Sequence, residues 1–367
     1  LGSNSWTIGN QLVSGFYPNR IPNPDLKWEK TGQFDIGFDL GLFNNRLRLT
    51  ADYYYKKTTD LLYNVAIPSA SGYDSMLKNI GSVQNKGYEL SIESDNLSGA
   101  FSWTTAFNIS FNRNKVLELG GETYKDVGTY DDHLKTSDIR RLIVGQPIGV
   151  FYGYRFDGIF QNEAECAQQT SSPSPIGVGL RRYKDLNGDG KIDATNDREI
   201  LGDANPKFFG GMTNTFAYKG FELNVFLQYS YGNKIFNYNA MELESPTGGQ
   251  NVYQDLVNRW TPTNPSNEYQ KATTNRNNIV SDRFIEDGSF LKLKTVSLSY
   301  SFPKLNWKHL GGLRLYVTGQ NLLTWTKYRG YDPEVSYRGA STLEAGEDFG
   351  GYPQARTFMF GIKLDIK

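Results

Sequence analysis

The segment "DLNGDGKIDATND" (residues 185–197) places acidic and amide residues at alternating positions. Asp185, Asn187 and Asp189 would supply side-chain oxygens at the first, third and fifth positions of a calcium-binding loop. Gly190 follows, at the position where such loops turn sharply. The spacing therefore predicts a Ca²⁺ site in this segment.

The second half of the segment fits the calcium pattern less well. Lys191 would offer its backbone carbonyl, and Asp193 would be a direct or water-mediated ligand at the ninth position. Asn196 occupies the twelfth position, where tight sites have a bidentate Glu, and Asp197 follows it. Asp197 closes the site only if the loop takes one extra residue, so we expect a weak structural site in the range of about 10⁻⁴–10⁻³ M. A metal-free Asp/Gly turn is the alternative.

Other chemistry has little support in the sequence. No phosphate-binding glycine loop, nucleophile elbow or zinc-protease motif occurs, so we expect no enzyme activity and assign no catalytic residue. The only cysteine, Cys166, cannot form an internal disulfide, and His133 and His309 are too few for a histidine metal site. Lys plus Arg and Asp plus Glu are 39 each, which argues against a nucleic-acid partner.

The elements that would position these residues are strands. In "RTFMFGIKLDIK" the apolar residues Phe358, Phe360 and Ile362 alternate with smaller or polar ones, and Lys363 and Asp365 lie on the opposite face. This pattern is typical of a strand with one face in lipid and the other facing a wet lumen. A mean hydropathy of −0.53 does not argue against a membrane barrel, because such strands alternate apolar and polar residues.

The same alternation predicts nine strands along the chain, separated by short turns and long polar segments in turn. The fold class is therefore an all-β transmembrane antiparallel barrel segment. We divide the chain into four parts. Residues 1–30 are an extracellular loop and strand entry, and residues 31–115 are strands with an outer loop at 58–82. Residues 116–205 are a large extracellular loop that carries the calcium pattern, and residues 206–367 are the C-terminal strands with outer loops at 234–287 and 326–354. Strand parity places 149–160 in the large loop although it partly alternates. Bacterial barrels have even strand numbers, so nine strands indicate an incomplete wall.

One strand breaks the alternation. In "FLKLKTVSLSYSF" the phase changes near Thr295, which gives Lys292 and Lys294 the parity of the apolar stripe. We expect these lysines to lie beyond the bilayer, and a β-bulge is the alternative.

Several longer motifs occur in a fixed order: "NPDLKWEKTGQFDIGFDLGLFNNRLRLTADYYYKKTTDLL" (23–62), "NIGSVQNKGYELSIES" (79–94), "ILGDANPKFFGGMTNTFAYKGFELNVFLQYSYGNKIFN" (200–237) and "GLRLYVTGQNLLTWTKYRGYDPEV" (312–335). With them, the chain resembles the C-terminal portion of the SusC/RagA family of TonB-dependent outer-membrane transporters of Bacteroidetes-type bacteria. The chain ends in Asp365, Ile366 and Lys367, whereas many family members end in an aromatic residue.

The resemblance implies that these strands are about the last nine of a 22-stranded barrel with a plug in its lumen. It further implies that the plug, the remaining strands and the segment that contacts the TonB complex lie upstream of Leu1. A SusD-like surface lipoprotein would close over an oligosaccharide or peptide that is imported actively across the outer membrane.

Two other functions remain open from the sequence: a secreted calcium-binding adhesion or scaffold module, and a passive porin. The outer loops contain aromatic residues of the kind that stack on sugars, but such residues also occur at membrane interfaces and in loop packing, so we assign none to the substrate. They are Tyr130, Tyr152, Tyr154, Tyr253 and Trp260.

Overall fold

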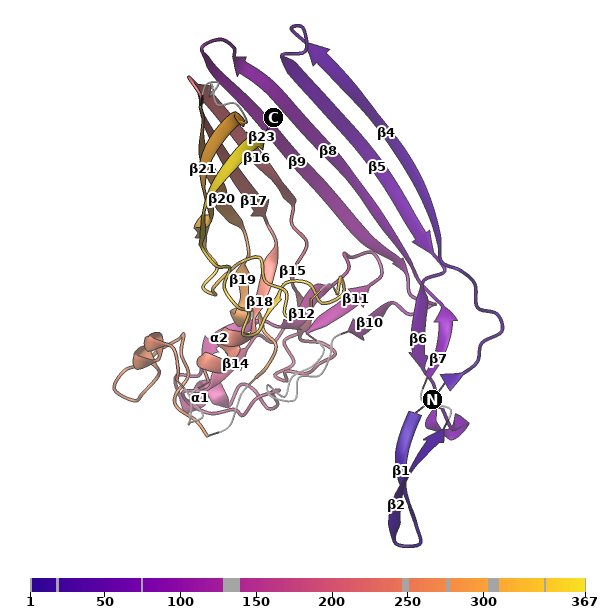
Figure 1. Cartoon of the computed structure of the whole chain (residues 1–367). Coiled ribbons are helices and arrows are strands. Elements are labelled where there is room, and N and C mark those ends of the chain that lie inside the picture. Colours follow the sequence, from indigo (N-terminus) through magenta and orange to yellow (C-terminus); the bar gives the residue numbers. More distant parts are fainter. Residues whose placement is uncertain are drawn as a thin grey trace.

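The computed structural model describes residues 2–17, 20–73, 75–127, 139–245, 251–274, 278–302, 310–339 and 341–366. Nine antiparallel strands form one curved sheet, which confirms the predicted fold class (Figure 1). In sheet order they are β23 (Thr357–Ile366), β21 (Leu310–Thr326), β20 (Phe290–Ser301), β17 (Phe221–Tyr231), β16 (Phe208–Tyr218), β9 (Phe101–Glu118), β8 (Ser82–Leu97), β5 (Leu47–Thr59) and β4 (Lys30–Leu42).

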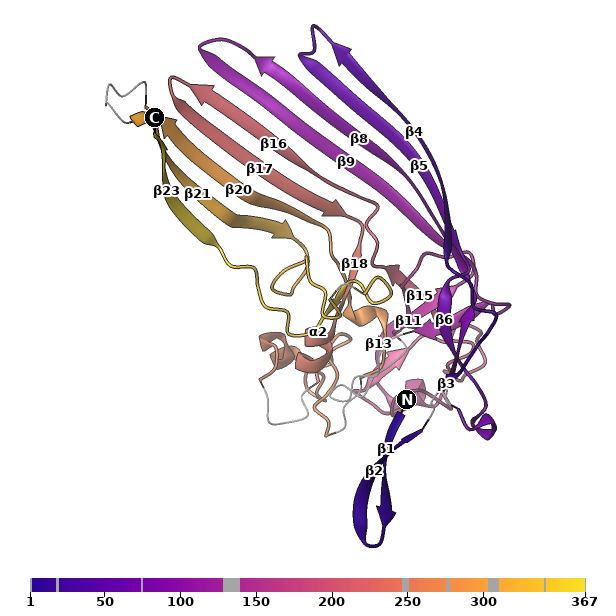
Figure 2. The ribbon, with the colours of Figure 1, turned by 45° about the vertical axis from the view of Figure 1, so that its right-hand side comes forward.

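The two ends of the sheet differ in their connections. The short links between strands and the C-terminus lie at one end, which we call the turn end (Figure 2). The long connections lie at the other, which we call the loop end. At the turn end, Phe43, Asn44 and Asn45 adopt φ values of 53°, 56° and 64°. Asn tolerates this left-handed conformation, which closes a tight hairpin whose twist matches the flanking strands.

The two faces of the sheet differ in polarity. Between β4 and β5, Phe34 pairs with Tyr55 and Ile36 with Tyr53 on one face, which we call the outer face. Asp35 and Asp39 are on the other, which we call the inner face, because successive side chains in a strand point to opposite sides. The register thus keeps the apolar set of every strand on one side of the wall.

A β-bulge explains the phase change in β20. Its register against β17 shifts between Leu293 and Thr295, so Lys294 is an extra residue there, and β21 places two residues, Asn321 and Leu322, opposite Lys294. The bulge moves Lys292 to the inner face, where 1% of its surface is exposed. The bulge alternative is therefore confirmed, and the expectation that Lys292 and Lys294 lie beyond the bilayer stays a prediction.

The long connections fold into a body of their own at the loop end, with two sheets that include the 149–160 segment (Figure 1). One contains β10 (Tyr124–Val127), β11 (Arg140–Ile143), β12 (Val150–Tyr154) and β15 (Arg198–Asp203), and the other β13 (Phe156–Ile159) and β14 (Arg181–Tyr183). Segment 149–160 thus lies outside the nine-stranded sheet. We call the described parts of 124–203, 234–287 and 327–349 the loop body.

A further sheet joins distant connections within the loop body. In it, β18 (Lys234–Asn237) pairs with β19 (Ile285–Asp287) and, in parallel, with β22 (Glu347–Asp348). The main core includes Phe151, Phe236, Met241 and Phe284, all with 0% exposure. The helices are short: α1 (Glu163–Cys166), α2 (Tyr238–Leu243) and the 3-10 turns η2 (Gln254–Asn258) and η3 (Asp282–Phe284). Among the described residues no helix is long and apolar enough to cross a membrane.

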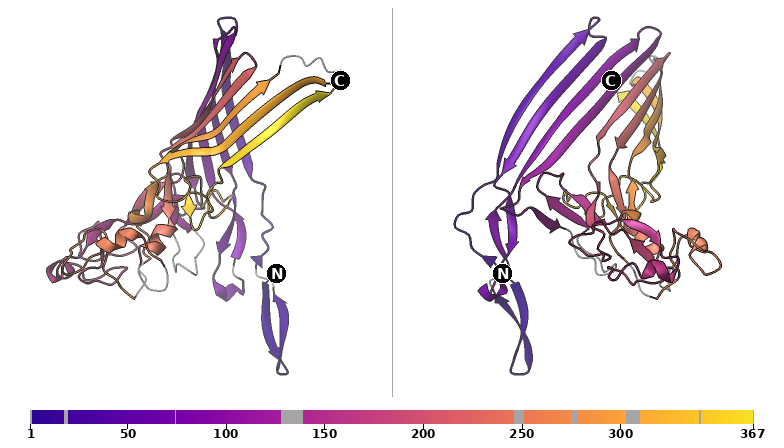
Figure 3. Two further views of the ribbon diagram at one scale, coloured as in Figure 1. Left: turned by 60° about the vertical axis from the view of Figure 1, so that its left-hand side comes forward. Right: turned by 180° about the vertical axis from the view of Figure 1, so that it is seen from behind.

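A smaller part projects from the loop end beside β4 and β5 (Figure 3). It consists of the hairpin β1 (Gly2–Ile8) and β2 (Gln11–Tyr17), the 3-10 turn η1 (Ser69–Ser71), and a three-stranded sheet of β3 (Arg20–Ile21), β6 (Leu62–Ala66) and β7 (Ser75–Asn79).

Candidate functional site

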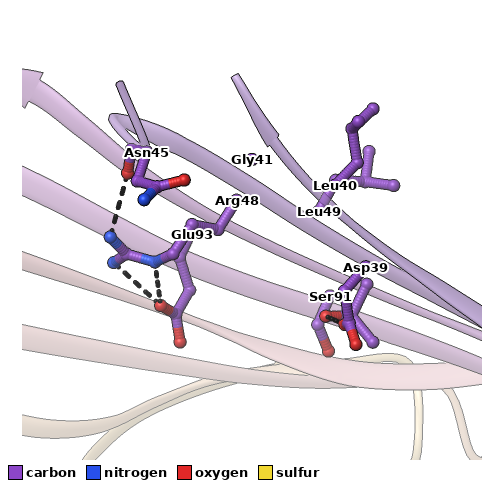
Figure 4. A pocket seen from close by; sticks show the side chains of 9 residues that line it. Asp39, Leu40, Gly41, Asn45, Arg48, Leu49, Ser91 and Glu93 are labelled. Carbon is purple, nitrogen blue, oxygen red and sulfur yellow. Dashed lines mark hydrogen bonds and ion pairs between the residues drawn. The ribbon is translucent and has the colours of Figure 1, made fainter. Parts of the chain in front are cut away.

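The inner face of the wall is rich in polar and charged residues. Near the turn end, β4, β5 and β8 line a hollow of about 420 Å³ with Asp39, Arg48, Thr50, Ser91 and Glu93 among its residues (Figure 4). Arg48 forms an ion pair with Glu93 at 2.9 Å, and Thr50 donates a hydrogen bond to Asp39 at 2.6 Å. Such a surface is hydrated rather than apolar, as expected for the lining of an aqueous lumen.

At two places on the inner face, a tyrosine ring lies directly over a glycine of the neighbouring strand. A Cβ atom on Gly87 would overlap the ring of Tyr54, and one on Gly361 would overlap the ring of Tyr316. Each tyrosine ring therefore lies across a neighbouring strand, where a larger residue would displace it. This covering of strand glycines by aromatic rings helps to fix the register of a sheet.

At the loop end, the inner face holds a segment of the β21–β23 connection. Nζ of Lys292 lies 2.6 Å from both Asp332 and Glu334, and Nζ of Lys294 lies 3.0 Å from Glu334. Gln228 on β17 also donates a hydrogen bond to Glu334, at 2.9 Å. Burial raises the pKa of Glu334, but the hydrogen bonds and charges of the two lysines outweigh burial, and the pKa lies below its ordinary value. We call residues 331–335 the anchored segment.

Buried ion pairs join the separate chain segments that make up the loop body. Arg140 and Glu347, whose side chains are 0% and 2% exposed, pair at 2.9 Å across 207 residues of sequence. Glu244 is 1% exposed and pairs with Arg283 at 2.7 Å and with Arg329 at 3.2 Å. Removal of one partner from such a pair leaves an uncompensated buried charge, so these contacts fix how the connections meet.

The predicted calcium loop lies in the loop body between β14 and β15. Asp185 accepts hydrogen bonds from the backbone N–H groups of Gly188 and Gly190, at 2.6 and 2.7 Å. Asp189 accepts one from the N–H of Lys191 at 2.8 Å. The amide of Asn187 also donates to Asp189 at 3.1 Å. These carboxylates thus bind the turns of the loop itself.

The other two carboxylates of the loop act in the same way. Asp197 is 0% exposed and accepts hydrogen bonds from the N–H groups of Leu186 and Asp193, each at 2.8 Å. Asp193 caps the turn at Thr195 and Asn196, which lowers its pKa. Within the described ranges, no three His, Cys, Asp or Glu residues are grouped so that they could hold a metal. The carboxylates as arranged do not form a common cluster, and the Ca²⁺ site stays a prediction.

Three of the loop aromatic residues named from the sequence, Tyr152, Tyr154 and Trp260, contact other side chains of the loop body. The guanidinium of Arg141 lies 3.9 Å from the ring centre of Tyr152, and Tyr154 packs on Tyr183 with ring centres 5.8 Å apart. Trp260 donates a hydrogen bond to Gln161 at 3.1 Å. Tyr253 is half-buried. Tyr130 lies outside the described residues, as do His133 and His309.

The ion pairs that hold the loop body in place were not predicted from the sequence. Lys292 and its two carboxylates are separated by about 40 residues, and Arg140 and Glu347 by more than 200. A single sequence carries no signal for these pairs, apart from the unusual position of Lys292 in an apolar stripe.

The cysteine of the chain, Cys166, is buried, and burial raises the pKa of its thiol.

A curved antiparallel sheet with an apolar outer face, a polar inner face and folded loops at one end defines a transmembrane β-barrel wall. Comparison with known proteins agrees. The family model described as "TonB dependent receptor-like, beta-barrel" matches residues 2–160. The chain belongs to the TonB-dependent receptor family of the bacterial outer membrane.

The relatives have similar names and are much longer. TonB-dependent receptor P3 of Formosa agariphila is 41% identical over 366 residues, which cover 97% of this chain and 36% of that protein. TonB-dependent receptor SusC of Bacteroides thetaiotaomicron is 29% identical, with 98% of this chain and 34% of SusC covered. The structure of the RagAB peptide transporter superposes with a TM-score of 0.79 at 26% identity, covering 99% of this chain and 38% of that one. The chain thus spans little more than a third of the proteins it matches.

Proposed function

We propose that the chain forms part of the wall of an active importer that takes up an oligosaccharide or a peptide across the outer membrane. In this proposal the loop end faces the outside, a SusD-like surface lipoprotein covers the loop body, and TonB supplies the energy through a plug outside these residues. The similarity to the RagAB peptide transporter supports a peptide cargo, and the resemblance to the SusC/RagA family supports an oligosaccharide as the other class.

The observation that carries the proposal is the anchored segment. Lys292 holds Asp332 and Glu334 against the inner face. The loop body is therefore attached to the rim of the wall by side-chain contacts as well as by the chain connections to the strands. A cargo bound by the loop body would therefore be held at the opening of the lumen. The buried pairs of the loop body, including Arg140 with Glu347, would keep that surface in one shape.

Uptake by cells tests the proposal. The full-length transporter is expressed in its host with and without TonB, and the import of labelled oligosaccharides and peptides of graded length is measured. We expect import of one of the two cargo classes, abolished without TonB and reduced when the lipoprotein gene is removed. Equal import without TonB would indicate a passive porin. Recovery of the full-length protein as a soluble monomer without detergent would indicate a secreted module and would overturn the proposal.

A further inference from the structure

Aromatic side chains gather on the outer face at the loop end of β16, β17, β20 and β21. They line a groove of about 620 Å³ together with a few polar residues. Strand parity and pairing place most of its apolar lining on the outer face, and Phe290 of the opposite parity completes it; the outer-face residues are Phe208, Tyr229, Tyr231, Leu291 and Trp325. We call this hollow the loop-end groove.

The apolar lining of the groove is partly packed and partly open. The rings of Phe208 and Tyr231 stack with centres 5.0 Å apart, and Phe208 meets Tyr229 nearly edge-on at 6.2 Å. Trp325 and Tyr231 nevertheless keep 52% and 51% of their surface exposed, and Leu291 keeps 40%. The groove is therefore a preformed apolar surface that can receive a chain of carbon atoms.

The rim of the groove toward the loops carries a lysine and an aspartate. Lys327 follows the last residue of β21, shares the parity of Trp325 and is exposed. Asp287 also lies at the rim, where it accepts hydrogen bonds from the N–H and Oγ of Ser289 at 3.1 and 2.6 Å. Burial raises the pKa of Asp287, but these bonds and the charges of Lys234 and Lys327 lower it overall. Asp287 and Lys327 are the charged residues of the described lining, and Lys234, the strand partner of Asp287, provides a second ammonium group near that carboxylate.

A second groove on the outer face provides a comparison. It lies between β17, β20, β21 and β23 near the turn end, has a volume of about 310 Å³, and includes Phe221, Leu298, Tyr300 and Phe360 in its lining. All the described residues that line it are uncharged. Both grooves face lipid in a barrel wall, but only the loop-end groove combines an aromatic lining with lysine at its rim.

We propose that the loop-end groove is a binding site for a phosphorylated lipid of the outer leaflet, with an acyl chain along Trp325 and Tyr231 and a phosphate beside Lys327. The groove is continuous with the apolar outer face, so in the membrane a lipid lies against it. Lysine donates charge-assisted hydrogen bonds to phosphate oxygens, and aromatic rings with polar edges suit the boundary between acyl chains and head groups. Lipid binding at this groove is separate from import, and it rests only on the proposal that the loop end faces the outside.

Lipid binding to the full-length transporter tests this site. The delipidated protein in mild detergent is titrated with monophosphoryl lipid A and, separately, with the zwitterionic dimyristoylphosphatidylcholine, and bound lipids are counted by native mass spectrometry. We expect one molecule of the phosphorylated lipid to bind at lower concentration than the zwitterionic one. Lys327→Gln removes one charge-assisted contact, so we expect about tenfold weaker binding of the phosphorylated lipid.

Matched variants separate the groove from the general outer surface. Trp325→Ala should weaken binding of both lipids, whereas Tyr300→Ala in the turn-end groove should leave the phosphorylated lipid bound as in the wild type. Equal affinity of the wild type for the two lipids, or unchanged affinity in Lys327→Gln, would overturn the site. Lys327 is exposed, so this variant is expected to fold, and its cargo import is measured in parallel. Loss of lipid binding with normal import leaves the proposed import function intact.

Discussion

Lys292 holds an ammonium group 2.6 Å from two carboxylates while only 1% of its surface is exposed. Replacement by Met would leave Asp332 and Glu334 without their main counter-charge, and breaking a buried pair in this way costs about 3–5 kcal/mol. We expect the anchored segment to detach while the sheet remains folded. Hydrogen exchange of residues 331–335 in the full-length protein would rise strongly. Lys294→Met is the matched control, because the Lys294 side chain is 29% exposed and pairs only with Glu334 in the described contacts. Equal exchange in the two variants would contradict this role of Lys292.

The lowered pKa of Glu334 predicts how the same contact depends on pH. A carboxyl group with a lowered pKa in the folded state stabilises the fold above the ordinary Glu value, and the contribution is lost as the pH falls through the folded pKa. We therefore expect protection of residues 331–335 to be constant above about pH 5 and to decline below about pH 4, the ordinary Glu range. Fluorescence of a probe attached next to the segment would report this release. If Glu334→Gln shows the same pH profile, Glu334 is not the titrating group.

The carboxylates of residues 185–197 separate two explanations of that loop. Asp197 binds backbone N–H groups directly, so Asp197→Ala should increase cleavage of the loop by trypsin with or without calcium. If the loop also binds Ca²⁺, a chelator should increase cleavage in the wild type without unfolding the barrel. Band patterns after timed digestion measure both effects. Equal cleavage of the wild type with and without chelator would contradict the calcium prediction.

At the scale of elements, the bulge in β20 decides which face receives a lysine. Deletion of Lys294 would remove the residue that has no partner in β17 and restore strict alternation, with Lys292 still on the inner face and Leu293 still on the outer face. We therefore expect the full-length deletion variant to fold as the wild type does, measured as the heat-modifiable band on a gel. Deletion of Asn224 from the regular strand β17 is the matched contrast, because it would move the apolar residues on one side of the deletion to the other face and should lower the folded fraction. A loss of the band in the Lys294 deletion equal to that in the Asn224 deletion would contradict the assignment of Lys294 as the extra residue.

Strand periodicity predicted the nine strands because outer and inner faces alternate within each strand, as Phe358 and Phe360 show. The bulge at Lys294 could not be chosen from sequence, because its evidence is the pairing with β17 and β21. The loop body was predicted only as long polar segments, since the contacts that fold it, such as Arg140 with Glu347, join residues far apart in the chain. Local patterns therefore identify the wall, whereas long-range contacts make the candidate site.

At the scale of the whole molecule, the sheet ends at two strands. Among the described strands, β4 and β23 each pair with a sheet neighbour on one side only. In a bilayer each unpaired backbone group costs several kcal/mol, so both edges need partner strands. We expect residues 1–367 refolded alone in detergent to form oligomers through these edges, whereas the full-length protein gives a heat-modifiable monomer. Size-exclusion chromatography with light scattering would distinguish them. A compact monomer of residues 1–367 would contradict this account of the edges.

The loop body has its own core and its own buried ion pairs, and each long connection leaves and re-enters the wall at adjacent strands. Insertions and deletions in the exposed connections therefore leave the pairing of the wall unchanged. In evolutionary terms, the loop end can diverge or be exchanged by recombination while the membrane-spanning register is inherited intact. For the proposed importer, this means that a lineage can acquire a new cargo by changing one end of the molecule.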